Sequence, residues 1–150
     1  MDKVFQKKMI DVGYKRCPKC GLFTPQKVYV SSSQKMFLGF AIGKMDTQYI
    51  LTCPNCKSNV EITEERIEAL KEFTKEHIPY EHQKNVWKEI FNTHKEYADY
   101  EDQMKFKDFF DMIKEKAREK IEIQISDKEY NYLFNAYLTN YARQNQQDGE

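Results

Sequence analysis

The second half of the chain repeats apolar residues with the period of an α-helix. The apolar positions recur three and four residues apart, and this spacing predicts four helices at about 64–78, 80–99, 103–119 and 126–143. Thr63 is suited to cap the first helix, and Pro79 ends it. Ser126-Asp127-Lys128-Glu129 has the form of a capping box, which predicts that the fourth helix starts there.

These four helices have apolar stripes wide enough to bury a shared core. We therefore predict an acidic helical bundle over residues 63–143, followed by a mobile tail at 144–150. The segment 121–125, Ile-Glu-Ile-Gln-Ile, fits a short strand or an extension of the third helix equally well.

Residues 1–62 have a different pattern. Short segments rich in β-branched and aromatic residues predict three or four short antiparallel strands, at 27–31, 34–40, 47–52 and 59–62. A sheet of this size cannot be stabilised by apolar burial alone. The predicted fold class is therefore α+β, with a small N-terminal sheet that needs a further source of stability.

The cysteines supply that source. The chain has four cysteines, in two Cys-Pro-X-Cys pairs. The first pair is Cys17 and Cys20, and the second is Cys53 and Cys56. We predict all four as metal ligands. A two-residue spacing lets both thiolates of one turn bind the same ion, and two such turns complete the tetrahedral site that Zn²⁺ prefers. Gly21 permits a positive φ after the first pair, whereas Lys57 stands at the matching place after the second. We predict one structural Zn²⁺, worth on the order of 10 kcal/mol to a small domain.

Other chemistry also uses paired cysteines. An iron–sulfur cluster or a single iron bound by four thiolates has similar spacing. A thioredoxin-type redox pair needs a βαβ pattern, which surrounds neither pair, and disulfides are disfavoured in a chain without an export signal. Zinc remains the favoured metal, with iron as the alternative.

Three segments, Cys17–Gly21, Met36–Ile42 and Tyr49–Cys56, together resemble a family. They are similar to small bacterial zinc-ribbon proteins, in which two Cys-Pro-X-Cys knuckles flank an aromatic-rich hairpin. The resemblance covers about residues 10–65 and implies a zinc-ribbon fold with the four cysteines as ligands. The chain departs from the family by lacking a Pro after the central aromatic residues and a Gly after the second knuckle. Zinc ribbons bind DNA, RNA or protein, so the resemblance leaves the partner open.

The two halves of the chain differ in net charge. The 150 residues hold 24 basic and 24 acidic side chains, but residues 1–60 have 10 basic against 3 acidic, and residues 61–150 have 14 against 21. The basic half fits contact with nucleic acid through Lys15, Arg16, Lys19 and Lys27. The same charge would also offset metal-bound thiolates. Only 4 of the 24 basic residues are Arg, which favours salt-sensitive phosphate binding over base-specific recognition.

The apolar segment 36–42 is a candidate docking element. Its Phe37, Leu38 and Phe40 would contact a partner or the C-terminal helices of the same chain, and we favour the helices.

No motif of a known catalytic centre is present, so we predict no catalytic residue and no small-molecule substrate. The longest apolar run has 7 residues, too short for a membrane span, and the N-terminus lacks the apolar region of a secretory signal. We expect a cytoplasmic, non-enzymatic zinc protein that acts as an adaptor for an unidentified protein partner. The alternative is a low-specificity nucleic-acid binder, acting in regulation or transcription, that uses the basic half.

Overall fold

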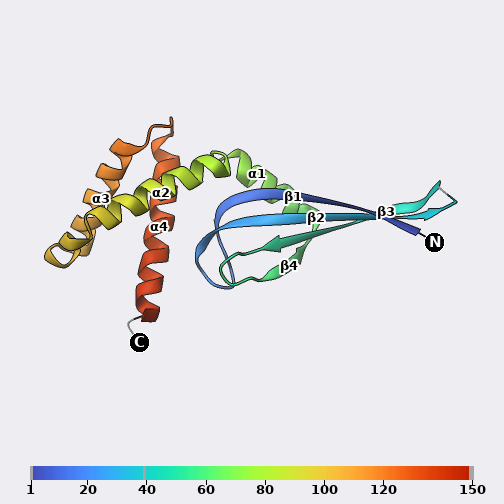
Figure 1. Ribbon diagram of the computed structural model, residues 1–150, viewed down its shortest axis with the longest axis horizontal. Coiled ribbons are helices and arrows are strands. Elements are labelled where there is room, and N and C mark those ends of the chain that lie inside the picture. The colour runs from blue at the N-terminus through green and yellow to red at the C-terminus, as the bar shows by residue number, and fades with distance from the viewer. Residues whose placement is uncertain (1, 39, 149–150) are drawn as a thin grey trace. The chain divides into compact units, whose positions relative to one another are not determined.

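The computed structural model describes residues 2–38 and 40–148, and it describes side chains over 8–32, at 38 and over 47–144. The α+β fold class is confirmed, with a four-stranded antiparallel sheet followed by four α-helices (Figure 1). The chain forms two compact units, residues 1–76 and 77–150. Each unit is described separately below.

The first unit contains one sheet with the strand order β1-β2-β3-β4, so each strand pairs with its neighbour in the sequence. The strands span Asp2–Arg16, Phe23–Phe37, Phe40–Thr52 and Asn59–Ile62. All pairs are antiparallel. The first three strands are much longer than the short strands expected, and β1 was not predicted at all.

A β-bulge in β1 explains why the alternation of apolar and polar residues does not predict this strand. Asp11 pairs with Lys27 and Gly13 pairs with Gln26, so Val12 is an extra residue in β1. A bulge changes which residues face inward. Before the bulge the even-numbered Ile10 packs against the core of the first unit, whereas after it the odd-numbered Lys15 lies on that face, with its Nζ 5.6 Å from the centre of the Phe73 ring. The period-2 signal is therefore broken in the middle of the strand.

The predicted strand at 34–40 is wrong, because this segment contains a hairpin turn. Phe37 at the end of β2 pairs with Phe40 at the start of β3. Leu38 lies in the turn with φ 51°, in the left-handed region, and Gly39 lies outside the described residues. A two-residue connection of this kind joins the strands tightly.

Helix α1, Glu64–Lys75, packs on one face of the sheet. Its buried Ile67 and Leu70 join a core formed with the sheet residues Val12, Val28, Leu51 and Ile62. Thr63 caps the helix as predicted, since its hydroxyl accepts a hydrogen bond from the Arg66 N–H at 3.3 Å. We expected α1 to begin the helical bundle after residue 62, but its apolar face is buried by the sheet, so the first unit extends to residue 76.

The second unit contains three α-helices rather than the four expected of the bundle. They are α2 (Tyr80–Glu96), α3 (Phe106–Lys120) and α4 (Asp127–Asp148), with a 3-10 helix η1 (Ala98–Gln103) between α2 and α3. Their fully buried side chains include Val86, Ile90, Phe109, Ile113 and Leu133. The predicted helix start is confirmed, because Ser126 Oγ accepts from the Glu129 N–H at 3.1 Å, but the Glu129 carboxylate lies against His77 and Gln83 rather than completing a capping box.

Residues 121–125 are neither strand nor helix. They form an irregular connection that is held by Arg118, whose Nη2 donates to the Ile125 carbonyl oxygen at 2.8 Å. Helix α4 continues to Asp148, so residues 144–148 extend it beyond the predicted end at 143, and residues 149–150 lie outside the described residues.

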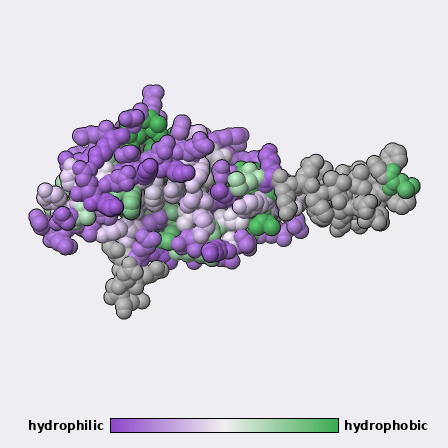
Figure 2. Space-filling view, in the orientation of Figure 1, coloured by the Kyte–Doolittle hydropathy of each residue, from purple (hydrophilic) through white to green (hydrophobic). Residues whose placement is uncertain are grey.

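The described surface is mainly hydrophilic, with apolar groups in small patches on the face in view (Figure 2). Among the helices of the described residues, none combines the length and the apolar character needed to cross a lipid bilayer.

Candidate metal centre

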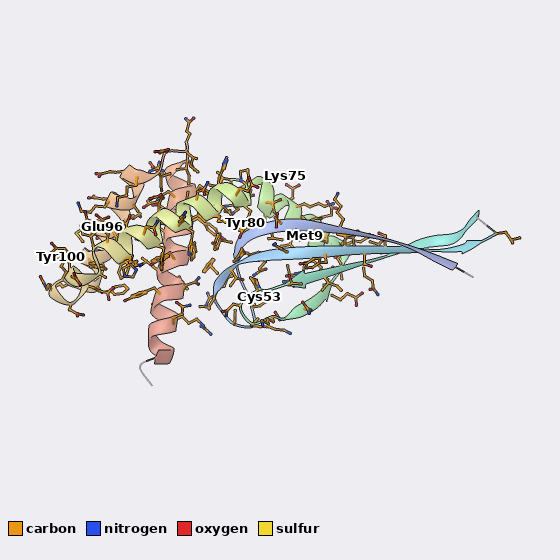
Figure 3. All side chains as sticks on the ribbon, viewed as in Figure 1. Met9, Cys53, Lys75, Tyr80, Glu96 and Tyr100 are labelled. Atoms are coloured by element: carbon orange, nitrogen blue, oxygen red, sulfur yellow. The ribbon has the colours of Figure 1, made fainter. Side chains whose placement is uncertain are left out.

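The four cysteines lie in the two connections at one end of the sheet. The first connection joins β1 to β2 and contains Cys17 and Cys20, and the second joins β3 to β4 and contains Cys53 and Cys56. Cys53 marks this end in Figure 3, at the opposite end of the sheet from the β2–β3 hairpin. Neighbouring antiparallel strands therefore bring together two pairs that are 33 or more residues apart in the sequence.

Backbone hydrogen bonds fold each connection into a tight knuckle. In the first, the Cys17 N–H donates to the Leu22 carbonyl at 2.9 Å, and the Gly21 N–H donates to the Cys17 carbonyl at 2.8 Å. In the second, the Cys53 N–H donates to the Ser58 carbonyl at 3.1 Å. The two knuckles thus hold their cysteines in place through main-chain hydrogen bonds.

Both knuckles need a left-handed residue directly after their second cysteine. Gly21 has φ 75° and Lys57 has φ 59°. Glycine adopts this conformation without a steric penalty, whereas the Cβ of lysine makes it cost about 1–2 kcal/mol. The second knuckle is therefore built like the first but at a higher conformational cost.

The thiol geometry fits a four-sulfur metal site. All four Sγ atoms lie within 4.8 Å of one another. The Cys17–Cys56 and Cys20–Cys53 pairs each have an Sγ–Sγ distance of 3.8 Å. Metal–sulfur bonds of 2.3 Å in a tetrahedron place the sulfur atoms about 3.8 Å apart, and a disulfide would need about 2 Å. The four cysteines could hold a metal ion, and none forms a disulfide.

The four thiols differ in burial and in hydrogen bonding. Cys17 and Cys53 are buried, Cys20 is half-buried and Cys56 is exposed. Hydrogen bonding to the side chain and backbone of Ser58 lowers the pKa of Cys56 to about 6. Burial raises the pKa of Cys20. Because a metal ion binds thiolates, it would remove the proton that burial otherwise retains on this sulfur.

The Cys17 thiol has opposing influences. Burial raises its pKa, but hydrogen bonds from the backbone of Cys20 and Lys19 outweigh burial and leave the pKa of Cys17 lowered. The Cys53 thiol has a buried hydroxyl as a neighbour. The Thr24 hydroxyl lies 3.3 Å from Cys53 Sγ, and both side chains are buried. A hydroxyl at this position can donate to a thiolate and stabilise its negative charge.

The four candidate nucleic-acid residues do not share one surface. Lys15 pairs with Thr24 and lies on the α1 side, where its Nζ is 5.6 Å from the centre of the Phe73 ring. Lys27 lies on the opposite face of the sheet, because its neighbour Val28 is buried under α1. Arg16 and Lys19 are exposed at the first knuckle. The structure thus separates Lys15 from Lys27.

The candidate docking residues lie at the β2–β3 hairpin. Leu38 is 83% exposed, which makes it the most exposed large apolar side chain of the described residues. The side chains of Phe37 and Phe40 lie outside the described residues, so the predicted contact of segment 36–42 with the helices also falls outside them.

The second unit contains histidine–carboxylate pairs that the sequence did not reveal. His77 Nδ1 lies 2.7 Å from Glu129 Oε2, and both side chains are largely buried. His94 Nε2 lies 2.9 Å from Glu101 Oε1. His77 lies in the connection between α1 and α2 and pairs with α4, and His94 of α2 pairs with η1, so helical spacing within one element could not have predicted either pair.

Comparison of the chain with family models, with curated proteins and with solved structures finds no match.

Proposed function

We propose that the protein is a non-enzymatic zinc-binding protein whose first unit is a zinc ribbon. The observation that carries this proposal is the cluster of four Sγ atoms within 4.8 Å. Four protein ligands would complete a tetrahedral shell and leave no open position for water or substrate, which is typical of structural zinc. The ion would join the two knuckles and thereby tie β1 and β2 to β3 and β4.

The metal assignment is tested by native mass spectrometry and absorption of protein purified without added chelator. We expect one zinc per chain and no visible absorption, because Zn²⁺ has a filled d shell. Cys17→Ala and Cys53→Ala should each lose the metal, whereas Thr47→Ala in β3 should retain it. Stoichiometric zinc in both cysteine variants would overturn the assignment of ligands. A coloured, iron-containing protein would overturn the assignment of zinc.

We further propose that the sheet face opposite α1 serves as a protein-docking surface. Met9 pairs with Tyr29, and Tyr29 pairs with Ile50, so these side chains form a row across three strands. Val28, next to Tyr29, faces α1, which places this row on the other side of the sheet. Met9 is 46% exposed and Tyr29 is 47% exposed. An apolar row left uncovered by the fold's own helix is typical of interaction surfaces.

A second candidate function, low-specificity nucleic-acid binding, is supported by the same face. A surface pocket of about 370 Å³ beside the second knuckle is lined by Lys27, Tyr29, Thr52, Lys57 and Asn59, among others. An exposed aromatic ring next to lysines is the arrangement that stacks a base and contacts its phosphates. The acidic side chains of α1 belong to a helix packed on the other face, so they do not interrupt this one.

The two roles are separated by fluorescence anisotropy of labelled single-stranded and double-stranded DNA and RNA, with zinc-loaded protein at low and at physiological salt. Nucleic-acid binding predicts affinity for single strands that persists at physiological salt. It should fall in the double variant Lys27→Gln/Lys57→Gln and remain in Lys15→Gln, a matched control on the opposite face. Binding seen only at low salt, or lost equally in the control, would reject nucleic-acid binding. Protein docking would then be the remaining proposal for the sheet face opposite α1.

A further inference from the structure

Helices α2 and α4 of the second unit line a surface pocket that is separate from the metal centre. The pocket has a volume of about 350 Å³. Its lining is mainly aromatic, with Trp87, Phe91 and His94 from α2 and Tyr137 and Tyr141 from α4. The three α2 residues are spaced four and three positions apart, so they lie on one face of that helix. Figure 1 shows α2 and α4 crossing each other in this unit.

The rings of this lining pack edge to face against one another rather than in a stack. Trp87 and Tyr137 have centroids 5.5 Å apart and planes at 69°. His94 and Tyr141 have centroids 4.8 Å apart and planes at 80°. His94 and Tyr137 are also nearly perpendicular, at 83°. Rings at these distances and angles contact one another directly, so a cation would not fit between them and would instead meet the ring faces that border the pocket.

A carboxylate holds two of these rings in place. Glu101 Oε1 lies 2.9 Å from His94 Nε2, and Glu101 Oε2 accepts a hydrogen bond from the Tyr141 hydroxyl at 2.6 Å. His94 Nδ1 lies 2.6 Å from the Tyr137 hydroxyl. Both ring nitrogens of His94 therefore have a hydrogen-bonding partner in this network. Hydrogen bonds donated to an anion increase the electron density of the donor rings, and this strengthens their attraction for a cation.

The charge around the pocket also favours a cation. No Lys or Arg is among the described residues that line it. The second unit, residues 77–150, has 11 basic and 15 acidic side chains, so its net charge is negative. A positively charged ligand would therefore meet a favourable field as well as aromatic walls.

We propose that this pocket binds a quaternary ammonium group through cation–π contacts with Trp87, Phe91 and Tyr141, supported by the charge of Glu101, which is hydrogen-bonded to the Tyr141 hydroxyl. A quaternary ammonium ion suits the site better than a metal ion, because the rings offer π faces and the one carboxylate is already used by two hydrogen bonds. The same chemistry occurs in small trimethylammonium compounds and in trimethylated lysine, and the experiment below distinguishes them. This site is independent of the zinc-dependent function proposed above.

Trp87 is the only tryptophan of the chain, so its fluorescence reports directly on this pocket. We would titrate the full-length, zinc-loaded protein with tetramethylammonium chloride, using KCl at the same ionic strength as control. The expected result is a saturable change in Trp87 emission that KCl does not produce. Choline should bind at least about fivefold more tightly than 3,3-dimethylbutan-1-ol, its uncharged carbon analogue. The dissociation constants of choline and of free trimethyllysine then show whether the pocket binds a small trimethylammonium compound or trimethylated lysine more tightly.

Two variants locate the binding site. Phe91 is 53% exposed and lines the pocket, so Phe91→Ala should weaken binding severalfold without unfolding the protein. Phe106 is 54% exposed on α3 and is not among the lining residues, so Phe106→Ala is the matched control and should bind as wild type. Glu101→Gln should weaken tetramethylammonium binding but not binding of the neutral analogue. The proposal is overturned if emission does not saturate, if the neutral analogue binds equally well, or if Phe91→Ala behaves like Phe106→Ala.

Discussion

The left-handed backbone at Lys57 is a conformational cost in the second knuckle that glycine would remove. Lys57 has φ 59°, and Gly21 has φ 75° at the matching place of the first knuckle. A residue with a Cβ pays about 1–2 kcal/mol for this conformation. Glycine avoids that cost but loses about 0.5–1 kcal/mol more backbone entropy on folding. The change Lys57→Gly should therefore stabilise the folded knuckle by a net of about 0.5–1 kcal/mol.

The assay is competition for zinc against a chelator of known affinity at fixed pH. Because folding of a small zinc site is coupled to metal binding, the gain in stability should appear as zinc affinity about two- to fivefold tighter. Lys57→Ala is the matched control, since it removes the same charge but keeps a Cβ in the left-handed region. It should bind zinc no more tightly than wild type. Equal affinity of Lys57→Gly and Lys57→Ala would refute the reasoning from backbone strain.

Three further predictions concern the stability of each unit. Ile67 is 2% exposed under the sheet, so Ile67→Ala should lower the free energy of unfolding of the first unit by about 2–5 kcal/mol in urea denaturation of the zinc-loaded protein; an unchanged midpoint would show that α1 is not packed there. Ser126→Ala removes the acceptor for the Glu129 N–H and should cost the second unit about 1 kcal/mol, measured from thermal unfolding by Trp87 fluorescence, and no change would argue against the cap. Burial raises the pKa of Tyr132 from 10.0 to about 12, so its stabilising contribution is complete below pH 10 and is lost as the pH rises towards 12. The melting temperature of the second unit should fall over that interval, and less steeply in Tyr132→Phe; superimposable profiles of the two proteins would contradict the assignment.

The helices could be predicted from sequence because their signals are local. Thr63 and Ser126 act within one turn of the chain, and each accepts the hydrogen bond expected of an N-cap. The partner of a helix is not a local property. The apolar face of α1 looks the same whether it packs on other helices or on a sheet, and only the structure shows Ile67 and Leu70 in the sheet's core.

The strands were harder to predict because tertiary pairing overrides their local pattern. The bulge at Val12 breaks the alternation of β1, and the lysines of this segment reduce its apolar signal further. In the 36–42 segment the apolar residues continue without interruption through a turn at Leu38, so the sequence does not mark where β2 ends. Pairing with β2 and β3 across the sheet determines both strands.

The candidate metal residues were found because chemistry and spacing coincide in them. Two Cys-Pro-X-Cys pairs predict four convergent thiols, and the structure places their Sγ atoms within 4.8 Å. The pocket between α2 and α4 has no such signature. His94, Tyr137 and Tyr141 fit an ordinary core stripe in the sequence, and their shared hydrogen bonds with Glu101 appear only when three helical segments meet.

Hydrogen exchange measured by mass spectrometry, with zinc bound and after its removal by a chelator, tests the central claim most directly. If a four-cysteine zinc site orders the first unit, removal of the metal should abolish protection in peptides from residues 8–76. Protection in peptides from residues 77–144 should remain, since the helical unit has its own core and contributes no residue to the candidate metal site. Unchanged protection of the sheet after complete zinc removal would contradict the account, as would equal loss in both units.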